Sequence, residues 1–304
     1  MAHKALQVTL FCYRKIYYIE ILEIDKQDVL FKVGCSVNTV IREYNDDAID
    51  LSVKVLGGSI AVQRLFYGNE WHWEHIRNNL QFNLDFLGQY VESIEKGGVL
   101  YKRKTPTPVY VNGQIILPTM LPVFVHDTYK ITKLVTGYRW EDKLGNWKEY
   151  DINGRLTSYG NRSGLLANLI YESGDNGKLI GITDINDRQV VWFEYNSNGQ
   201  ISAVQDNADR RVEYSYTDAR LTGVTDVLSN ETTYEYDSDG RIIRSVDAGG
   251  RPTIATYDSY GNVASVIDRN GNGHFFNYDY DEVAQEYYAQ IKTTSGMGET
   301  SLGF

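Results

Sequence analysis

A tyrosine recurs at nearly constant spacing through the second half of the chain. Successive members are 20 to 24 residues apart, and four of the six intervals are 21 residues; they are Tyr150, Tyr171, Tyr195, Tyr216, Tyr236, Tyr257 and Tyr278. A fixed period of this length is typical of repeat architectures, in which each period is one structural unit stacked on the next. The period therefore restricts the fold more than any other feature of the sequence.

Each unit carries two turn signals. The first is a glycine four residues after the tyrosine, which is displaced to Gly177 in one unit and replaced by Asp218-Ala219 in another; its members are Gly154, Gly199, Gly240 and Gly261. The second is an Asp or Asn seven residues later, with an Arg or Asn four residues further on. Glycine adopts positive φ without steric cost, and Asp or Asn bonds its own downstream backbone. Both marks therefore predict turns.

Two turns in about 21 residues leave two strands of about six residues, which is the usual strand length. Each unit is therefore predicted to be a β-hairpin, and the chain an all-β protein built as a continuous antiparallel meander. The repeat-defining strand and turn positions are Tyr150 with Gly154, Tyr195 with Gly199, Tyr236 with Gly240, and Tyr257 with Gly261. We expect these glycines in equivalent turns and these tyrosines on one common face.

The strand after each first turn alternates poorly. Its apolar residues lie three apart, as in Ile201 and Val204 or Leu221 and Val224. This spacing predicts either a β-bulge in each second strand or burial on both faces, and both interpretations stay open.

Upstream of the repeats the pattern is strand-rich but irregular. Gly57-Gly58 and Asn112-Gly113 each stand between apolar runs, which predicts two hairpins. "GNEWHWEHIRNNLQF" predicts at most a short helix near residues 71–80. The repeat pattern divides the chain into an N-terminal strand-rich region, 1–136, and a region of repeat hairpins, 137–304.

The repeated Tyr-Asp motif resembles the RHS/YD-repeat family. The resemblance rests on "EYDINGRLTSY", "YEYDSDGRIIRSV" and "TYDSYGNVASVIDRNG", and it covers residues 137–281. Upstream, "AIDLSVKVLGGSIAVQRLFYGNEWHWEHIRNNLQF" is similar to the segment that precedes the repeats in many bacterial members. The resemblance implies a curved sheet that forms part of a hollow β-shell, which commonly encloses a C-terminal toxin, in proteins that are secreted or lie at the cell surface.

The conserved core and toxin of such proteins are not recognised in this sequence, so we expect the front part of an RHS protein. Its expected partners are a polypeptide cargo or a further RHS chain that pairs with an edge strand.

Composition excludes several other functions. The formal net charge is −10, which disfavours nucleic-acid binding. Apolar runs are too short for a membrane span, so we expect no membrane insertion, and the N-terminus is not a recognisable signal peptide. Cys12 and Cys35 could form one disulfide or remain two ordinary thiols.

Two segments suggest metal ligands, each with a simpler explanation. In "WHWEHIR", His72 and His75 flank Glu74, but a third ligand is not evident, so a packed aromatic loop is favoured over a zinc site. "DSDG" at 237–240 is similar to the opening of a calcium loop, yet the hairpin period explains its Asp and Gly. Motifs for nucleophilic catalysis, phosphate binding and dinucleotide binding are not found, so we expect no catalytic residues, no metal and no cofactor.

Two functional hypotheses follow. The favoured one is a non-catalytic structural segment of an RHS-type shell that encloses or contacts a polypeptide. The alternative is a carbohydrate-binding surface module, because aromatic rows stack on sugar rings; against it, repeated tyrosines in a sheet usually pack against one another. An enzyme is the least favoured class.

Overall fold

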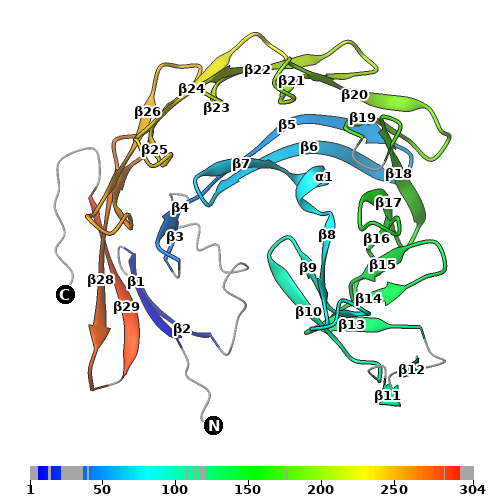
Figure 1. Ribbon diagram of the computed structural model, residues 1–304. Helices are drawn as coiled ribbons and strands as arrows, with labels where there is room; N and C mark the ends of the chain where they lie inside the picture. Colours follow the sequence, from blue (N-terminus) through cyan, green and yellow to red (C-terminus); the bar gives the residue numbers. More distant parts are fainter. Residues whose placement is uncertain are drawn as a thin grey trace. The chain divides into compact units, whose positions relative to one another are not determined.

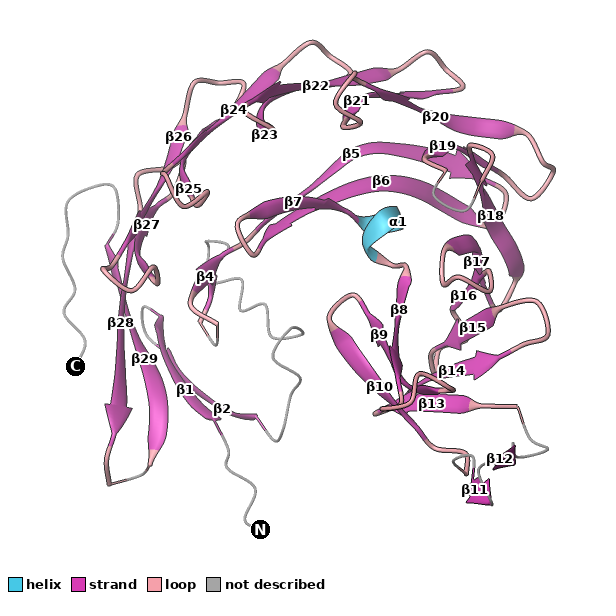
Figure 2. Cartoon of the chain, in the orientation of Figure 1, coloured by secondary structure: helices cyan, strands magenta, loops and turns pink. Residues whose placement is uncertain are grey.

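The computed structural model describes residues 6–12, 15–21, 37–39, 41–106, 109–111, 114–116, 121–174, 177–283 and 285–294. Strands and the turns between them make up nearly all of this part of the chain (Figure 2), which confirms the predicted all-β class. The described residues form one helix, α1 (Glu74–Arg77), inside the range where a short helix was expected. Among the described residues, a helix that is long and apolar enough to cross a membrane is absent. Cys35 lies outside the described residues, so the Cys12–Cys35 pair stays untested.

The chain divides into two compact units. Unit 1 contains Met1–Asp47, Leu65–Trp71 and Ser215–Phe304, and unit 2 contains Ala48–Arg64 and His72–Tyr214. The regions 1–136 and 137–304 were defined differently, by where the repeat pattern begins, and they stay a prediction about sequence organisation.

In unit 2, antiparallel strands follow one another as hydrogen-bonded neighbours in chain order (Figure 1). They are β8 (Leu80–Leu84), β9 (Val91–Lys96), β10 (Val99–Arg103), β13 (Val123–His126), β14 (Tyr129–Lys133), β15 (Tyr138–Glu141), β16 (Trp147–Tyr150), β17 (Leu156–Asn161), β18 (Gly164–Tyr171), β19 (Leu179–Thr183), β20 (Gln189–Tyr195) and β21 (Ile201–Asp206). β22 (Arg211–Thr217) continues from β21 and ends in unit 1.

Unit 1 contains an antiparallel meander as well. Its repeat strands are β23 (Arg220–Thr225), β24 (Glu231–Tyr236), β25 (Ile242–Val246), β26 (Pro252–Tyr257), β27 (Val263–Ile267), β28 (Gly273–Asp281) and β29 (Glu286–Thr294), each paired antiparallel with the next. The N-terminal part of this unit adds two small strand pairs, β1 (Leu6–Cys12) with β2 (Lys15–Ile21) and β3 (Val37–Asn38) with β4 (Glu43–Tyr44).

The upstream hairpins also form. β5 (Asp46–Val55) and β6 (Gly58–Tyr67) are neighbours around Gly57, which has φ 93°, and β7 (Glu70–Trp73) follows. β11 (Val109–Val111) pairs with β12 (Gln114–Ile116), as expected for the second hairpin. Its turn residues, Asn112 and Gly113, lie outside the described part of the chain.

A β-bulge explains the three-residue apolar spacing. In the β20–β21 pair, Tyr195 lies opposite Ile201 and Phe193 lies opposite Val204, with one extra residue on β21. Residues directly opposite each other share a face, and Tyr195 and Phe193 are two apart on one strand. Ile201 and Val204 therefore share that face despite their odd spacing. The same register shift precedes the repeat tyrosine in four other hairpins, at Tyr150, Tyr171, Tyr236 and Tyr257.

The core of each unit lies on the face to which the bulge returns these residues. In unit 2, Leu156, Leu179 and Ile182 are at most 2% exposed, and in unit 1 Ile242, Val263 and Val266 are at most 1% exposed. Burying side chains of this size contributes about 1.5–3 kcal/mol each before chain entropy is counted. The repeats are therefore held by a row of aliphatic residues contributed one hairpin at a time.

Candidate functional site

The four predicted turn glycines occupy the same kind of turn. Gly154, Gly199, Gly240 and Gly261 have φ of 85°, 82°, 87° and 85°, in the left-handed region. Each glycine amide donates to the carbonyl of the residue three positions earlier. At Gly154 a side chain is also excluded by contact, because a Cβ would come within 2.6 Å of the Leu80 carbonyl oxygen.

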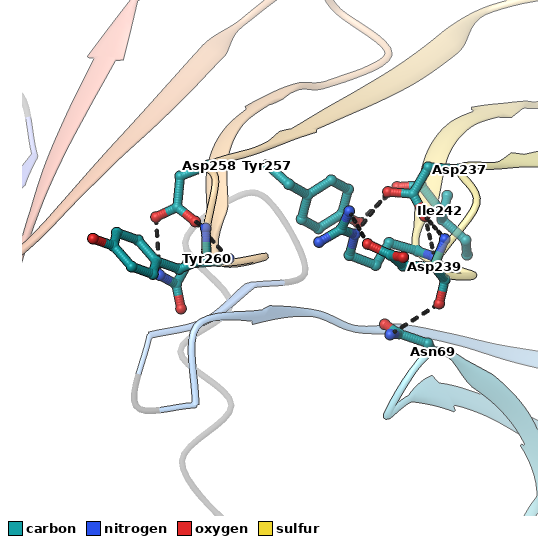
Figure 3. A network of polar contacts seen from close by, with 9 residues as sticks. Asn69, Asp237, Asp239, Ile242, Tyr257, Asp258 and Tyr260 are labelled. Atoms are coloured by element: carbon teal, nitrogen blue, oxygen red, sulfur yellow. Dashed lines mark hydrogen bonds and ion pairs between the residues drawn. The ribbon is translucent and has the colours of Figure 1, made fainter.

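A carboxylate inside the turn holds it closed. Oδ1 of Asp237 accepts the amides of Asp239 (3.0 Å) and Arg241 (2.9 Å), and Oδ2 accepts Nε of Arg241 at 2.7 Å (Figure 3). Burial pushes the pKa of Asp237 upward, but the hydrogen bonds and charge of Arg241 outweigh it and hold the pKa below its ordinary value. Both carboxylate oxygens that a calcium ion would use already accept bonds within the turn.

Asp258 repeats this arrangement with an uncharged partner. It accepts the amides of Tyr260 (2.8 Å) and Asn262 (2.9 Å) and the side-chain amide of Asn262. Tyr260 lies at the exposed tip of this turn.

In five units the second turn, which the sequence suggested as a separate signal, is the same motif. Asp206 accepts the amides of Ala208 and Arg210 and the Arg210 guanidinium, just as Asp237 does with its own neighbours. The left-handed position is taken here by Asp187, Asp209, Ser229, Gly250 or Gly271. Asp and Ser can stand where glycine stands in the first turns, so the glycine alone was an incomplete signal.

The repeat tyrosines join successive hairpins through their hydroxyl groups. Each hydroxyl donates to the carbonyl of the residue two positions after the preceding first-turn residue. These bonds are Tyr171 to Leu156 (2.7 Å), Tyr195 to Leu179 (2.8 Å), Tyr236 to Leu221 (2.5 Å) and Tyr257 to Ile242 (2.7 Å). The recurrence of one bond at four places makes it a structural rule of the repeat.

A basic side chain lies over each of the same rings. It is the residue directly after the first-turn position of the preceding hairpin, and the distances to the ring centroid are 4.4 Å for Arg155 over Tyr171, 4.9 Å for Lys178 over Tyr195, 5.6 Å for Arg220 over Tyr236 and 4.9 Å for Arg241 over Tyr257. A cation over an aromatic face is attracted by the ring quadrupole, by about 0.5–2 kcal/mol depending on burial. We call these four tyrosines, with their cations and acceptor carbonyls, the tyrosine ladder.

The ladder was missed by sequence reasoning, although a signal for it was present. Each cation precedes its tyrosine by 16 or 17 residues, as Arg241 precedes Tyr257. This spacing is hidden when the repeat is aligned on its tyrosines alone. Burial raises the pKa of Tyr195 to about 12 and that of Tyr257 further, so the hydroxyls stay protonated and act as donors.

Tyr150, the first predicted repeat tyrosine, lies outside the ladder. It is 3% exposed and stands opposite Tyr138 in the β15–β16 pair. Its hydroxyl is buried and has no hydrogen-bond partner among the described residues. Burial raises its pKa well above the ordinary value.

The histidine segment "WHWEHIR" is divided between elements with different contacts. His72 lies in β7, and His75 lies in α1, where its Nε2 is 3.4 Å from the Tyr159 hydroxyl. Burial, with the nearby charge of Lys148, lowers the pKa of His75 to about 4. Among the described residues, groups of three or more His, Cys, Asp or Glu side chains suited to a metal ion are absent.

A buried ion pair is a further feature that sequence reasoning missed. Arg64 donates to both carboxylate oxygens of Asp50, at 3.0 and 2.8 Å, and Asp50 also accepts the Tyr214 hydroxyl at 3.0 Å. The one signal was the position of Arg64 in β6, where it continues the buried alternation of Ile60 and Val62.

The turns, bulges and ladder together define a protein built from β-hairpin repeats. The family model for the RHS Repeat matches residues 214–252 and 236–273. Residues 214–273 therefore carry RHS repeats, as the Tyr-Asp motifs predicted.

Solved structures and curated proteins match in addition. A structure of TcdB2-TccC3 is 12% identical, covers 96% of this chain and 20% of that chain, and has a TM-score of 0.33. TcdB2-TccC3-TEV is 13% identical, covers 84% and 14%, and has a TM-score of 0.30. Shorter matches join the chain to probable tRNA pseudouridine synthase B proteins. That of Methanococcus maripaludis strain C6 is 35% identical over 103 residues, 32% of this chain and 27% of that protein. That of Pyrococcus horikoshii is 72% identical over 29 residues, 10% and 9%. The chain thus spans about a quarter or less of these curated relatives.

Proposed function

We propose that this chain is a non-catalytic structural segment of an RHS-type shell, which encloses or contacts a polypeptide. The observation that carries the proposal is the tyrosine ladder. Its hydroxyls donate to carbonyls of the neighbouring hairpin, its cations lie over neighbouring rings, and the carboxylates beside them bond within their own turns. A catalytic centre would bring hydroxyl, basic and carboxylate groups together at one point. In the ladder these groups instead bind neighbouring hairpins or their own turns.

Repeated contacts between neighbouring hairpins are suited to building an extended sheet. Four hairpins make the same contacts with their neighbours, so these steps of the sheet are built with the same chemistry. The proposal predicts protection of a polypeptide and no turnover of a substrate.

Protection of a tethered polypeptide tests this function. An unstructured, protease-sensitive segment is fused after Phe304, and the same segment is fused to an unrelated β protein of similar size as the control. We expect the fusion to this chain to be digested more slowly at equal protease concentration. Equal digestion rates in the two fusions would contradict the proposal.

Carbohydrate binding is a second candidate, favoured by one hollow in unit 1. The hollow has a volume of about 480 Å³, and its lining includes Tyr257, Glu235, Arg244, Thr256 and Asp258. Charged side chains beside an aromatic ring suit a polar ligand of sugar size. The four tyrosine rings of the ladder are less suited to stacking on sugars, because a cation already covers one face of each ring.

A glycan array with matched variants tests the second candidate. Arg244→Ala removes an exposed arginine of the hollow that pairs with Glu235 at 2.7 Å. Arg211→Ala removes a similar exposed arginine, paired with Glu194, that does not line the hollow. Binding that is lost in the first variant and kept in the second would support a sugar site, and an array without signal for the parent chain would exclude it.

A further inference from the structure

The hairpin after the last ladder tyrosine does not supply a cation of its own. In four hairpins the residue after the first-turn position is basic, but after Gly199 it is Gln200, and after Gly261 it is Asn262, whose side-chain amide donates to Asp258 at 2.9 Å. The tyrosine that follows Asn262 at the ladder spacing of 16 residues is Tyr278. The repeat sequence therefore leaves this ring without the basic neighbour that the four ladder rings have.

An arginine from the N-terminal part of unit 1 takes that place. The Arg42 guanidinium carbon lies 5.0 Å from the centre of the Tyr278 ring and 5.6 Å from the centre of the Tyr287 ring. The two rings belong to β28 and β29, which pair antiparallel. Two tyrosine faces thus contact one guanidinium, whereas each ladder cation contacts one.

The backbone of the same segment is bound as well. The Val263 amide donates to the Arg42 carbonyl at 2.9 Å, and Glu43 accepts the Gly68 amide at 3.2 Å. Val263 follows Gly261 by two residues, the position whose carbonyl accepts the tyrosine hydroxyl elsewhere in the ladder. Arg42 has φ 61° and is the last residue of the turn between β3 and β4, where left-handed backbone is common. The tyrosine rings contact the Arg42 side chain, and the Val263 amide binds the Arg42 carbonyl.

We propose that Tyr278, Tyr287 and the Val263 amide form a binding site for an arginine-bearing polypeptide segment, and that residues 41–44 of this chain occupy it. The two rings recognise the planar guanidinium, and the amide recognises the carbonyl of the same residue. Lysine fits less well, because its compact ammonium is more strongly hydrated and does not stack. The site stands independently of the shell function proposed above.

Hydrogen exchange at the Val263 amide reports directly on occupancy. Arg42→Ala removes the cation, and we expect exchange at Val263 to become about 2- to 5-fold faster, the range expected for one partly exposed cation–π contact. Arg42→Lys should lie between that variant and the parent chain. An exchange rate at Val263 that is unchanged in Arg42→Ala would overturn the site.

A second variant tests the same site without altering Arg42. Asn262→Arg gives the last repeat its own cation, which should lie over Tyr278 as Arg241 lies over Tyr257 and compete with Arg42. We expect faster exchange at Val263 and across residues 41–44. Unchanged exchange at both places would contradict the equivalence between Arg42 and the ladder cations.

A peptide added in trans tests whether the site binds a separate polypeptide. The probe is a peptide with the sequence of residues 37–47, added to the Arg42→Ala protein, and its control carries Gln in place of the arginine. The arginine peptide should restore slow exchange at Val263 and the control should not. If neither peptide or both peptides restore it, the site does not recognise arginine in a separate chain.

Discussion

Two regions of unit 2 bury a carboxylate in different ways. In the turn after β21, the side chain of Asp206 is 1% exposed and is held by groups at most four residues away, the amides of Ala208 and Arg210 and the Arg210 side chain. In the β5–β6 hairpin, the side chain of Asp50 is 5% exposed and depends on Arg64, 14 residues away, and on Tyr214, 164 residues away.

The two carboxylates differ in pKa as well as in partners. Burial raises the pKa of Asp50, and the charge and hydrogen bonds of Arg64 and Tyr214 only partly offset it. At Asp206 burial also acts upward, but the bonds from Arg210 and the turn amides outweigh it and lower the pKa. A turn supplies its own donors, so its carboxylate ionises easily. A carboxylate buried by distant strands needs each partner to be in place.

Removing one partner of the distant pair should have the largest effect. Arg64→Met leaves Asp50 buried without its cation, and we expect a loss of about 3–5 kcal/mol in the free energy of unfolding. The double variant Asp50→Leu/Arg64→Met removes the uncompensated charge and should regain most of this loss. Urea denaturation of both variants measures it; a double variant no more stable than the single one would show that the charge is not the cause.

Lowering the pH should reduce the stability contributed by a titratable group buried by packing before it reduces the stability contributed by the turn carboxylates. His75 has an ordinary pKa of 6.5 and a folded-state pKa of about 4, so its stabilisation is complete above pH 6.5 and is lost as the pH falls toward 4. The full loss corresponds to about 3 kcal/mol. The turn carboxylates, with lowered pKa values, lose theirs only below their ordinary 3.8.

The difference between the parent chain and His75→Gln isolates this group. Free energies of unfolding measured from pH 7 to pH 4 should converge as the pH falls. Curves that stay parallel would mean that His75 does not resist protonation in the folded state.

A turn carboxylate should matter less than the distant pair. Asp206→Ala removes the acceptor of two amides and of a half-exposed Arg210, and we expect a loss of about 1.5–3 kcal/mol. Asp206→Asn keeps an oxygen for the amides and should lose less, because Asn196 accepts the amides of Asn198 and Gln200 in the same way. Thermal unfolding of both variants checks the order, and equal losses would contradict the role of the amide bonds.

The ladder hydroxyls should give the smallest effect. Tyr257→Phe removes one bond to the Ile242 carbonyl and should cost about 1 kcal/mol. Tyr150→Phe is the matched control, since the Tyr150 hydroxyl is buried without a partner and its removal should be neutral or stabilising. A Tyr150→Phe loss as large as that of Tyr257→Phe would show that the loss at Tyr257 does not come from its bond to the Ile242 carbonyl.

Local chemistry made much of the fold predictable from the sequence. Gly240 and its equivalents need positive φ, Asp237 bonds amides within its own turn, and tyrosine favours a strand, so the hairpin and its period follow from neighbouring residues. The spacing of Ile201 and Val204 predicted either a β-bulge in the second strand or burial on both of its faces. The register of the β20–β21 pair shows the β-bulge. Sequence reasoning placed glycine and aspartate correctly in turns but did not show that both turns of a unit are one motif.

Which distant side chains meet depends on the packing of the folded chain. Three contacts depend on how the strands align and on which segment covers which face of the sheet. They are Arg241 over Tyr257, Arg64 with Asp50, and Arg42 over Tyr278. The hairpins follow from the sequence alone, because turn chemistry and strand propensity act within about five residues. The sequence did not determine these contacts, because many basic and aromatic residues could pair equally well by type, and the packing of the strands selects among them.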